Sequence, residues 1–98
     1  SVTKVGGITE FAKICDLAAA SGRTLMPHSP YFGPGYWATL QLAAARTEAG
    51  LFEYLYISQE AVIDPTMPRP QGGVLEIPDR PGIGCTPDPK IIERYRIG

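Results

Sequence analysis

TLMPHSPYFGPGYWATLQLAAAR, residues 24–46, contains the clearest alternation of predicted elements in the chain. Its first four residues, Thr24–Pro27, are mostly apolar and predict a short strand that ends at His28. A loop rich in glycine and proline follows, from Ser29 to Gly35. The residues from Tyr36 to Arg46 are apolar on nearly all sides, which is typical of a well-buried helix. The stretch therefore predicts a strand, a loop and a helix in that order.

The same alternation extends to both sides of this stretch. Upstream, apolar residues from Ile8 onward recur at a spacing of three and four, which predicts a one-sided surface helix that ends at Gly22. A short extended piece, Val2–Val5, precedes it, and downstream Leu51–Ile57 predicts a further strand. Strands and helices at these intervals indicate right-handed parallel βαβ units, so the expected fold class is α/β. Three strands are too few to close a barrel.

The composition changes beyond Ser58. Prolines interrupt the chain repeatedly, and only Val74–Ile77 predicts a strand. A last helix is expected over Pro89–Tyr95, capped by Asp88 with Pro89 at its first position. We therefore divide the chain into residues 1–57, with the alternating elements, and residues 58–98, a tail expected to wrap over another part of the molecule.

Composition excludes several classes of function. Hydrophobic residues make up 44% of the 98 residues and the net charge is −1, without a basic run, so no nucleic-acid partner is expected. The longest nearly apolar stretch, Tyr36–Ala45, is shorter than the roughly 20 residues that span a bilayer, so no membrane partner is expected either. Cys15 and Cys85 are expected to be free thiols in a reducing cytoplasm, with a disulfide between them as the alternative.

His28 is the first candidate for chemistry. It is the only histidine and follows a predicted strand, between Pro27 and Pro30, which stiffen the backbone around it. In (β/α) barrels the active site lies at the C-terminal ends of the strands, where a catalytic base would be placed. Histidine can accept and return a proton near neutral pH. The alternative is a histidine that is only hydrogen-bonded in a loop.

Glu53 is the second candidate, because it interrupts a strand that is otherwise apolar and aromatic. A carboxyl group inside a barrel is costly unless it is paired or protonated. A protonated carboxyl could donate a hydrogen bond to the oxygen of a developing enolate. The alternative is that Glu53 faces outward and meets a basic side chain of a neighbouring helix.

Weaker candidates surround these two residues. Lys4 could lie near the same mouth of the barrel, although a lone lysine before two glycines is more often solvated. Tyr31 and Phe32 could line a substrate pocket, or they could only pack the loop down.

Four segments together resemble the mandelate racemase and muconate lactonizing enzyme family of the enolase superfamily. They are VTKVGGITE at Val2–Glu10, MPHS at Met26–Ser29, FEYLY at Phe52–Tyr56 and GGVLEIPDRPGIG at Gly72–Gly84. They occur in the order and spacing of the family and cover nearly the whole chain. The combination is specific, although no single segment is decisive.

This resemblance implies the C-terminal portion of a (β/α) barrel. Ser1–Lys4 would be the end of strand six, Thr24–Pro27 strand seven and Leu51–Leu55 strand eight, and the tail from about Ser58 would return to an α+β capping domain. The remainder of the barrel and the capping domain would then be partners of this chain, and a homo-oligomer is expected.

The resemblance also implies roles for residues. His28 would match the general base of a His-Asp dyad, and Glu53 the glutamate that hydrogen-bonds the substrate carboxylate as it becomes an enediolate. The aspartate of the dyad would fall at Ser1, which cannot supply a negative charge to the imidazole. Mg²⁺ is implied as cofactor, with its ligands on strands three to five, so no metal ligand is expected in this chain.

The function that follows from the resemblance is Mg²⁺-dependent removal of the proton next to a carboxylate in a small molecule. Dehydration of an acid sugar or hydroxy acid is the first expectation, because a single strong base with a histidine acid would suffice. A racemase, epimerase or cycloisomerase is the alternative within the family. A non-catalytic α/β binding module, or an inactive barrel kept for assembly, remains the alternative of another class.

Overall fold

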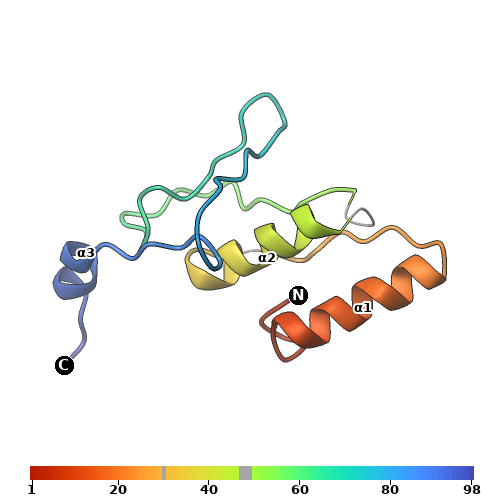
Figure 1. The fold of residues 1–98 in the computed structure, drawn as a ribbon. Coiled ribbons are helices and arrows are strands. Elements are labelled where there is room, and N and C mark those ends of the chain that lie inside the picture. The colour runs from red at the N-terminus through yellow and green to blue at the C-terminus, as the bar shows by residue number, and fades with distance from the viewer. Residues whose placement is uncertain (30, 47–49) are drawn as a thin grey trace.

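The computed structural model describes residues 1–29, 31–46 and 50–98 and consists of three helices joined by long irregular segments (Figure 1). The helices are α1 (Ile8–Ala20), α2 (Pro34–Ala45) and α3 (Pro89–Arg94). Pro30, expected to stiffen the loop around His28, lies outside the described residues. No helix in the described ranges is both long enough and apolar enough to cross a membrane.

Helix α1 has the one-sided character that the sequence predicts. Phe11, Cys15 and Ala18 are its buried residues. The helix ends in a Schellman motif, because Arg23 N donates to Ala18 O at 2.8 Å and Gly22 N donates to Ala19 O at 3.0 Å. Gly22 has φ of +61°, a conformation that glycine adopts without the cost of a Cβ. The predicted helix and its terminating glycine are therefore confirmed.

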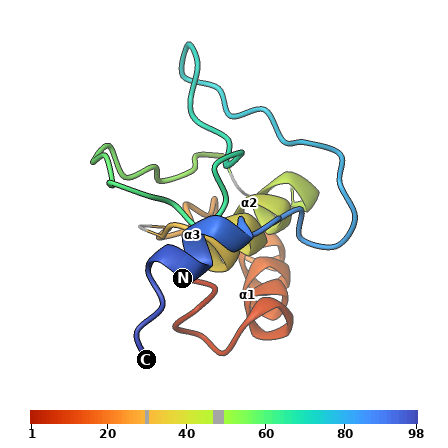
Figure 2. The ribbon, with the colours of Figure 1, turned by 90° about the vertical axis from the view of Figure 1, so that its left-hand side faces the viewer.

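Helix α2 is the centre of the molecule. Its residues Tyr36 to Leu40 are all buried, as the apolar sequence on every side predicts. Val2, Phe11, Cys15 and Ala38 form one buried cluster, and Tyr36, Trp37, Leu40 and Met67 form the other. Figures 1 and 2 show α1 beside α2 and the irregular segments on the other side of α2. The Arg46–Asp16 ion pair, at 2.9 Å, joins the end of α2 to α1.

The tail is attached to α2 by polar and aromatic contacts. Tyr36 Oη donates a hydrogen bond to Pro68 O at 2.9 Å. Burial, together with the neighbouring Tyr54, raises the pKa of the Tyr36 hydroxyl, so the group stays a donor at neutral pH. The Arg80 guanidinium lies 5.7 Å from the centre of the Trp37 ring. The tail therefore contacts α2 of the same chain through Pro68 and Arg80.

Helix α3 lies at the end of the molecule opposite α1 (Figure 1). Asp88 accepts a hydrogen bond from Lys90 N at 2.8 Å, and Pro89 occupies the first turn. The predicted helix, its cap and its proline are confirmed, with an end at Arg94 instead of Tyr95.

The expected strands do not form in the described part of the chain, and the structure does not show the barrel portion. Thr24–Pro27 contains only a single bridge residue, Leu25, and Leu51–Ile57 is irregular. Val2–Val5 lies in turns in which Lys4 N and Val5 N both donate to Ser1 O. The prediction of strands at these positions is corrected. The physical reason is that a strand is stabilised by hydrogen bonds to neighbouring strands, whereas a helix satisfies its own backbone.

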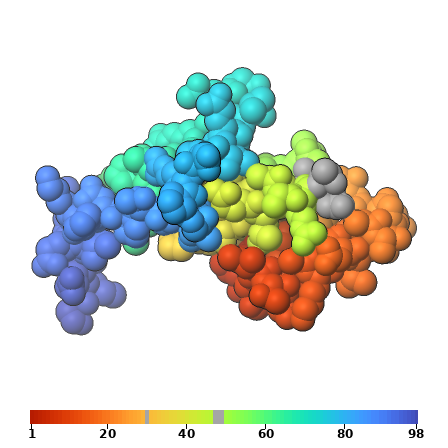
Figure 3. Space-filling model, in the orientation of Figure 1, coloured from red at the N-terminus to blue at the C-terminus, as the bar shows by residue number. Residues whose placement is uncertain are grey.

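The tail strand expected at Val74–Ile77 does not form, and a tight turn lies directly before it. Gln71 and Val74 form an isolated antiparallel bridge around Gly72 and Gly73, which both have positive φ. Positive φ at both central residues is the geometry of a type I′ turn, which favours glycine. The loop that carries this turn projects from the body of the molecule (Figure 3).

Candidate functional site

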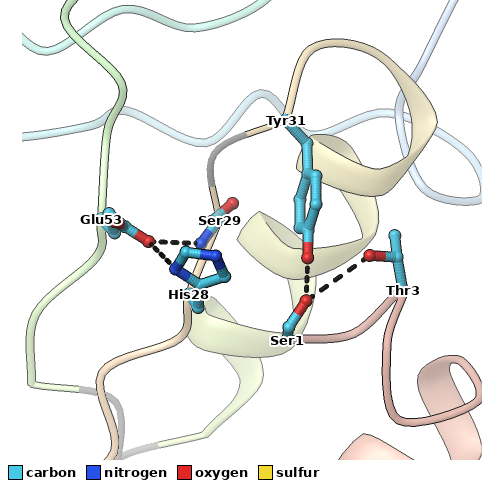
Figure 4. A network of polar contacts seen from close by, with 6 residues as sticks. All are labelled: Ser1, Thr3, His28, Ser29, Tyr31 and Glu53. Carbon is cyan, nitrogen blue, oxygen red and sulfur yellow. Dashed lines mark hydrogen bonds and ion pairs between the residues drawn. The ribbon is translucent and has the colours of Figure 1, made fainter.

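His28 and Glu53, the two residues that the sequence singles out, are in direct contact. Nδ1 of His28 lies 2.8 Å from Oε2 of Glu53 (Figure 4). The two residues come from the segments expected as neighbouring strands. The segments thus meet through side chains, although they form no strands.

The backbone next to His28 strengthens this contact. Ser29 N donates to the same Oε2 atom of Glu53 at 2.8 Å. Ser29 is only 1% exposed, and this buried residue fixes the position of the carboxyl group. Its own hydroxyl has no hydrogen-bond partner among the described residues. One oxygen of Glu53 therefore accepts a hydrogen bond from the backbone and lies at ion-pair distance from the imidazole.

This arrangement bears on which nitrogen of His28 is available for chemistry. A carboxylate oxygen only accepts hydrogen bonds, so its position beside Nδ1 favours the form of the ring with the hydrogen on Nδ1. In the neutral ring, Nε2 then has the free lone pair. The His28 side chain is 50% exposed, so a small molecule can approach it. The pair can accept a proton at Nε2 and balance the resulting positive charge with the carboxylate.

Ser1 and Tyr31 form a second polar contact. The Ser1 and Tyr31 hydroxyls are hydrogen-bonded to each other, and Thr3 Oγ1 lies 3.5 Å from Ser1 Oγ (Figure 4). Ser1, which the resemblance aligns with the aspartate of the dyad, is therefore hydrogen-bonded to Tyr31. The charged group on Nδ1 of His28 is Glu53 instead. The sequence did not predict that Glu53 would lie beside Nδ1 of His28.

The remaining candidates, Tyr31, Phe32 and Lys4, have other surroundings. Phe32 packs against the buried cluster of Tyr36, Trp37, Leu40 and Met67, and Tyr31 also contacts that cluster. Both aromatics thus contact this cluster, and whether they also line a substrate pocket stays a prediction. Lys4 is exposed.

A divalent cation does not fit the described residues. No group of three or more His, Cys, Asp or Glu side chains in the described ranges lies close enough together to hold a metal ion. His28 and Glu53 supply only two such side chains. The Mg²⁺ that the resemblance implies therefore has no site of its own in this part of the structure.

Asp64 is a buried charged residue that the sequence reasoning missed. It is 1% exposed, and its carboxylate accepts hydrogen bonds from Thr66 N, Thr66 Oγ1 and Thr86 N. Burial by itself would raise the pKa of Asp64, but these hydrogen bonds and the nearby Arg80 charge outweigh it and hold the pKa below its usual value. Asp64-Pro65-Thr66 carried a usable signal, since an aspartate two residues before a hydrogen-bond donor is typical of a turn. The role is structural, because Asp64 closes the tail on itself.

Comparison with known proteins identifies the family. No solved structure matches the chain well enough to be compared with it. The family model described as enolase C-terminal domain-like matches residues 1–91, which includes His28, Glu53 and most of the tail. The chain therefore belongs to the mandelate racemase and muconate lactonizing enzyme family of the enolase superfamily and corresponds to its C-terminal part.

Proposed function

We propose that this chain supplies the proton-transfer group of an enzyme that acts on the carbon next to a carboxylate. The observation that carries the proposal is the 2.8 Å contact between His28 Nδ1 and Glu53 Oε2, which leaves Nε2 of an exposed imidazole available. Membership of the enolase superfamily supports the reaction class. The Mg²⁺ implied by the family resemblance would need ligands beyond this chain.

The substrate class we favour is an acid sugar or another hydroxy acid, and the reaction is loss of water. Nε2 of His28 takes the proton from the carbon next to the carboxylate, which leaves an enediolate. The protonated imidazole can then deliver that proton to the hydroxyl group that leaves from the neighbouring carbon. One histidine is sufficient for both steps, whereas racemisation needs competent groups on both faces of the carbon.

Hydrogen exchange tests the first step. The complete protein is incubated in D₂O with Mg²⁺ and a panel of acid sugars and hydroxy acids, and the signal of the α-proton is followed by ¹H NMR. Loss of that proton together with formation of a 2-keto product supports dehydration. Exchange at the α-carbon with inversion, but without loss of water, would identify a racemase or epimerase instead.

A negative result is equally informative. Turnover in which the α-proton is neither exchanged nor lost contradicts the proposed chemistry. If none of the panel loses or exchanges this proton, while the protein binds a partner through these segments, the non-catalytic alternative replaces the proposal.

A further inference from the structure

The resemblance assigns Glu53 to the substrate carboxylate, but its contacts indicate a different role. Oε2 of Glu53 lies 2.8 Å from His28 Nδ1, and it accepts a hydrogen bond from Ser29 N, also at 2.8 Å. Two N–H groups beside one carboxyl oxygen favour the ionised form of the carboxyl group, since hydrogen bonds to a charged acceptor are stronger than those to a neutral one. A protonated carboxyl group that donates to an enediolate would lose this advantage.

The position expected to hold the charged partner of His28 cannot provide it. Ser1 is uncharged, and its hydroxyl contacts Tyr31 and Thr3 instead of the imidazole. In Figure 4 the carboxyl group of Glu53 faces the Nδ1 edge of His28, while Ser1 points toward Tyr31. Glu53 therefore lies beside Nδ1, where a carboxylate can orient the imidazole and stabilise its protonated form.

We infer that Glu53 is the positioning residue of His28. Its carboxylate fixes the hydrogen on Nδ1, holds the ring in one orientation and stabilises the imidazolium that forms when Nε2 takes a proton. The inference deepens the proposed function and rests on it for the proton that is transferred. The pairing of the two side chains, however, can be measured without any substrate.

The first test is spectroscopic. Long-range ¹H–¹⁵N correlation spectra of the complete protein are recorded at a pH where the imidazole is neutral, and the His28 signals are identified by their disappearance in the His28→Asn variant. The inference predicts that Nδ1 carries the hydrogen in the native protein, and that the Glu53→Ala variant shifts the ring toward the Nε2-protonated form. A native ring with its hydrogen on Nε2 overturns the inference.

The second test is a double-mutant cycle on the rate of α-proton removal. Glu53→Gln preserves the size of the side chain and removes its charge, and Glu76→Gln is a matched control at an exposed glutamate of the tail. If Glu53 acts through His28, Glu53→Gln slows the native enzyme by roughly tenfold or more but causes little further loss in the His28→Asn background. If the two losses multiply instead, Glu53 acts on the substrate independently and the inference is wrong.

The two tests separate this inference from the proposed function. A hydrogen on Nδ1 that depends on Glu53, in a protein that removes no α-proton, supports the pairing and contradicts the proposed reaction. α-Proton removal that depends on His28, with the hydrogen on Nε2, supports the reaction and contradicts the role of Glu53.

Discussion

Among single residues, the carboxylate of Asp64 has the most closely defined environment. Its hydrogen bonds lower the pKa in the folded protein, so they stabilise the fold above the unfolded pKa, which is about 3.9 for aspartate. That contribution is lost as the pH falls through the lower, folded pKa.

We predict that Asp64→Asn lowers the free energy of unfolding by about 1.5–3 kcal/mol at pH 7, because a charged acceptor of three hydrogen bonds is removed. Urea denaturation of the complete protein measures the change, and Asp79→Asn at an exposed position is the control. The difference between the native protein and Asp64→Asn should decrease below about pH 4, where the carboxyl group becomes protonated. A difference that is the same at pH 7 and pH 3 contradicts this account.

For single residues, the sequence singled out His28 and Glu53 but did not predict that they contact each other. His28 stood out as the only histidine, directly after a predicted strand, and Glu53 because it interrupts an otherwise apolar and aromatic segment. Their contact depends on how two segments separated by α2 approach each other, which no local pattern encodes. Glu53 was expected to be paired or protonated inside a barrel, or else to face a basic side chain of a neighbouring helix, and the structure places it beside His28.

At the scale of elements, the helix termini are the features that local sequence determines most directly. Gly22 ends α1 with φ of +61°, and an L-residue pays about 1–2 kcal/mol in that conformation. We predict that Gly22→Ala lowers the free energy of unfolding of the complete protein by roughly this amount. Gly98→Ala, where φ is not positive and an added Cβ meets nothing within 4 Å, is the control. Equal stability of both variants would show that the Schellman motif does not hold the end of α1.

Helices were predicted better than strands, because helix signals are local in the sequence. The periodicity of α1, the apolar run of α2 and the Asp-Pro cap of α3 are local signals, and all three helices form. Strands depend on partners distant in sequence, and residues 24–27 and 51–57 form no strand in the structure. The Gly72-Gly73 pair was overlooked as a turn because it lies directly before the apolar residues of an expected strand.

At the scale of the whole molecule, the chain is more open than a compact domain of its length. Its radius of gyration is 14.4 Å, whereas about 13 Å is usual for roughly 100 residues. Large hydrophobic side chains are exposed in the segments expected as strands, including Met26 at 63% and Leu51 at 69%. The prediction that the remainder of a barrel covers these segments would account for both observations.

We predict that Leu51→Ala destabilises the complete protein by about 2–5 kcal/mol, the usual cost of a leucine removed from a core. Gln59→Ala, at an exposed polar position of the same region, should change the stability by no more than about 0.5 kcal/mol. Thermal and urea denaturation of the two variants provide the comparison. If Leu51→Ala is as mild as Gln59→Ala, no other part of the protein covers this segment.

The His28→Asn variant tests whether Nε2 of His28 transfers the proton next to the substrate carboxylate. Asparagine can still donate a hydrogen bond to Glu53 but cannot take up a proton, so the fold should persist. The measurement is the rate of α-proton loss or exchange in D₂O, in the native protein and in His28→Asn, with circular dichroism to confirm that both are folded. We predict a decrease of about a hundredfold or more with an unchanged fold. A folded His28→Asn variant that removes the α-proton at the native rate would contradict the account.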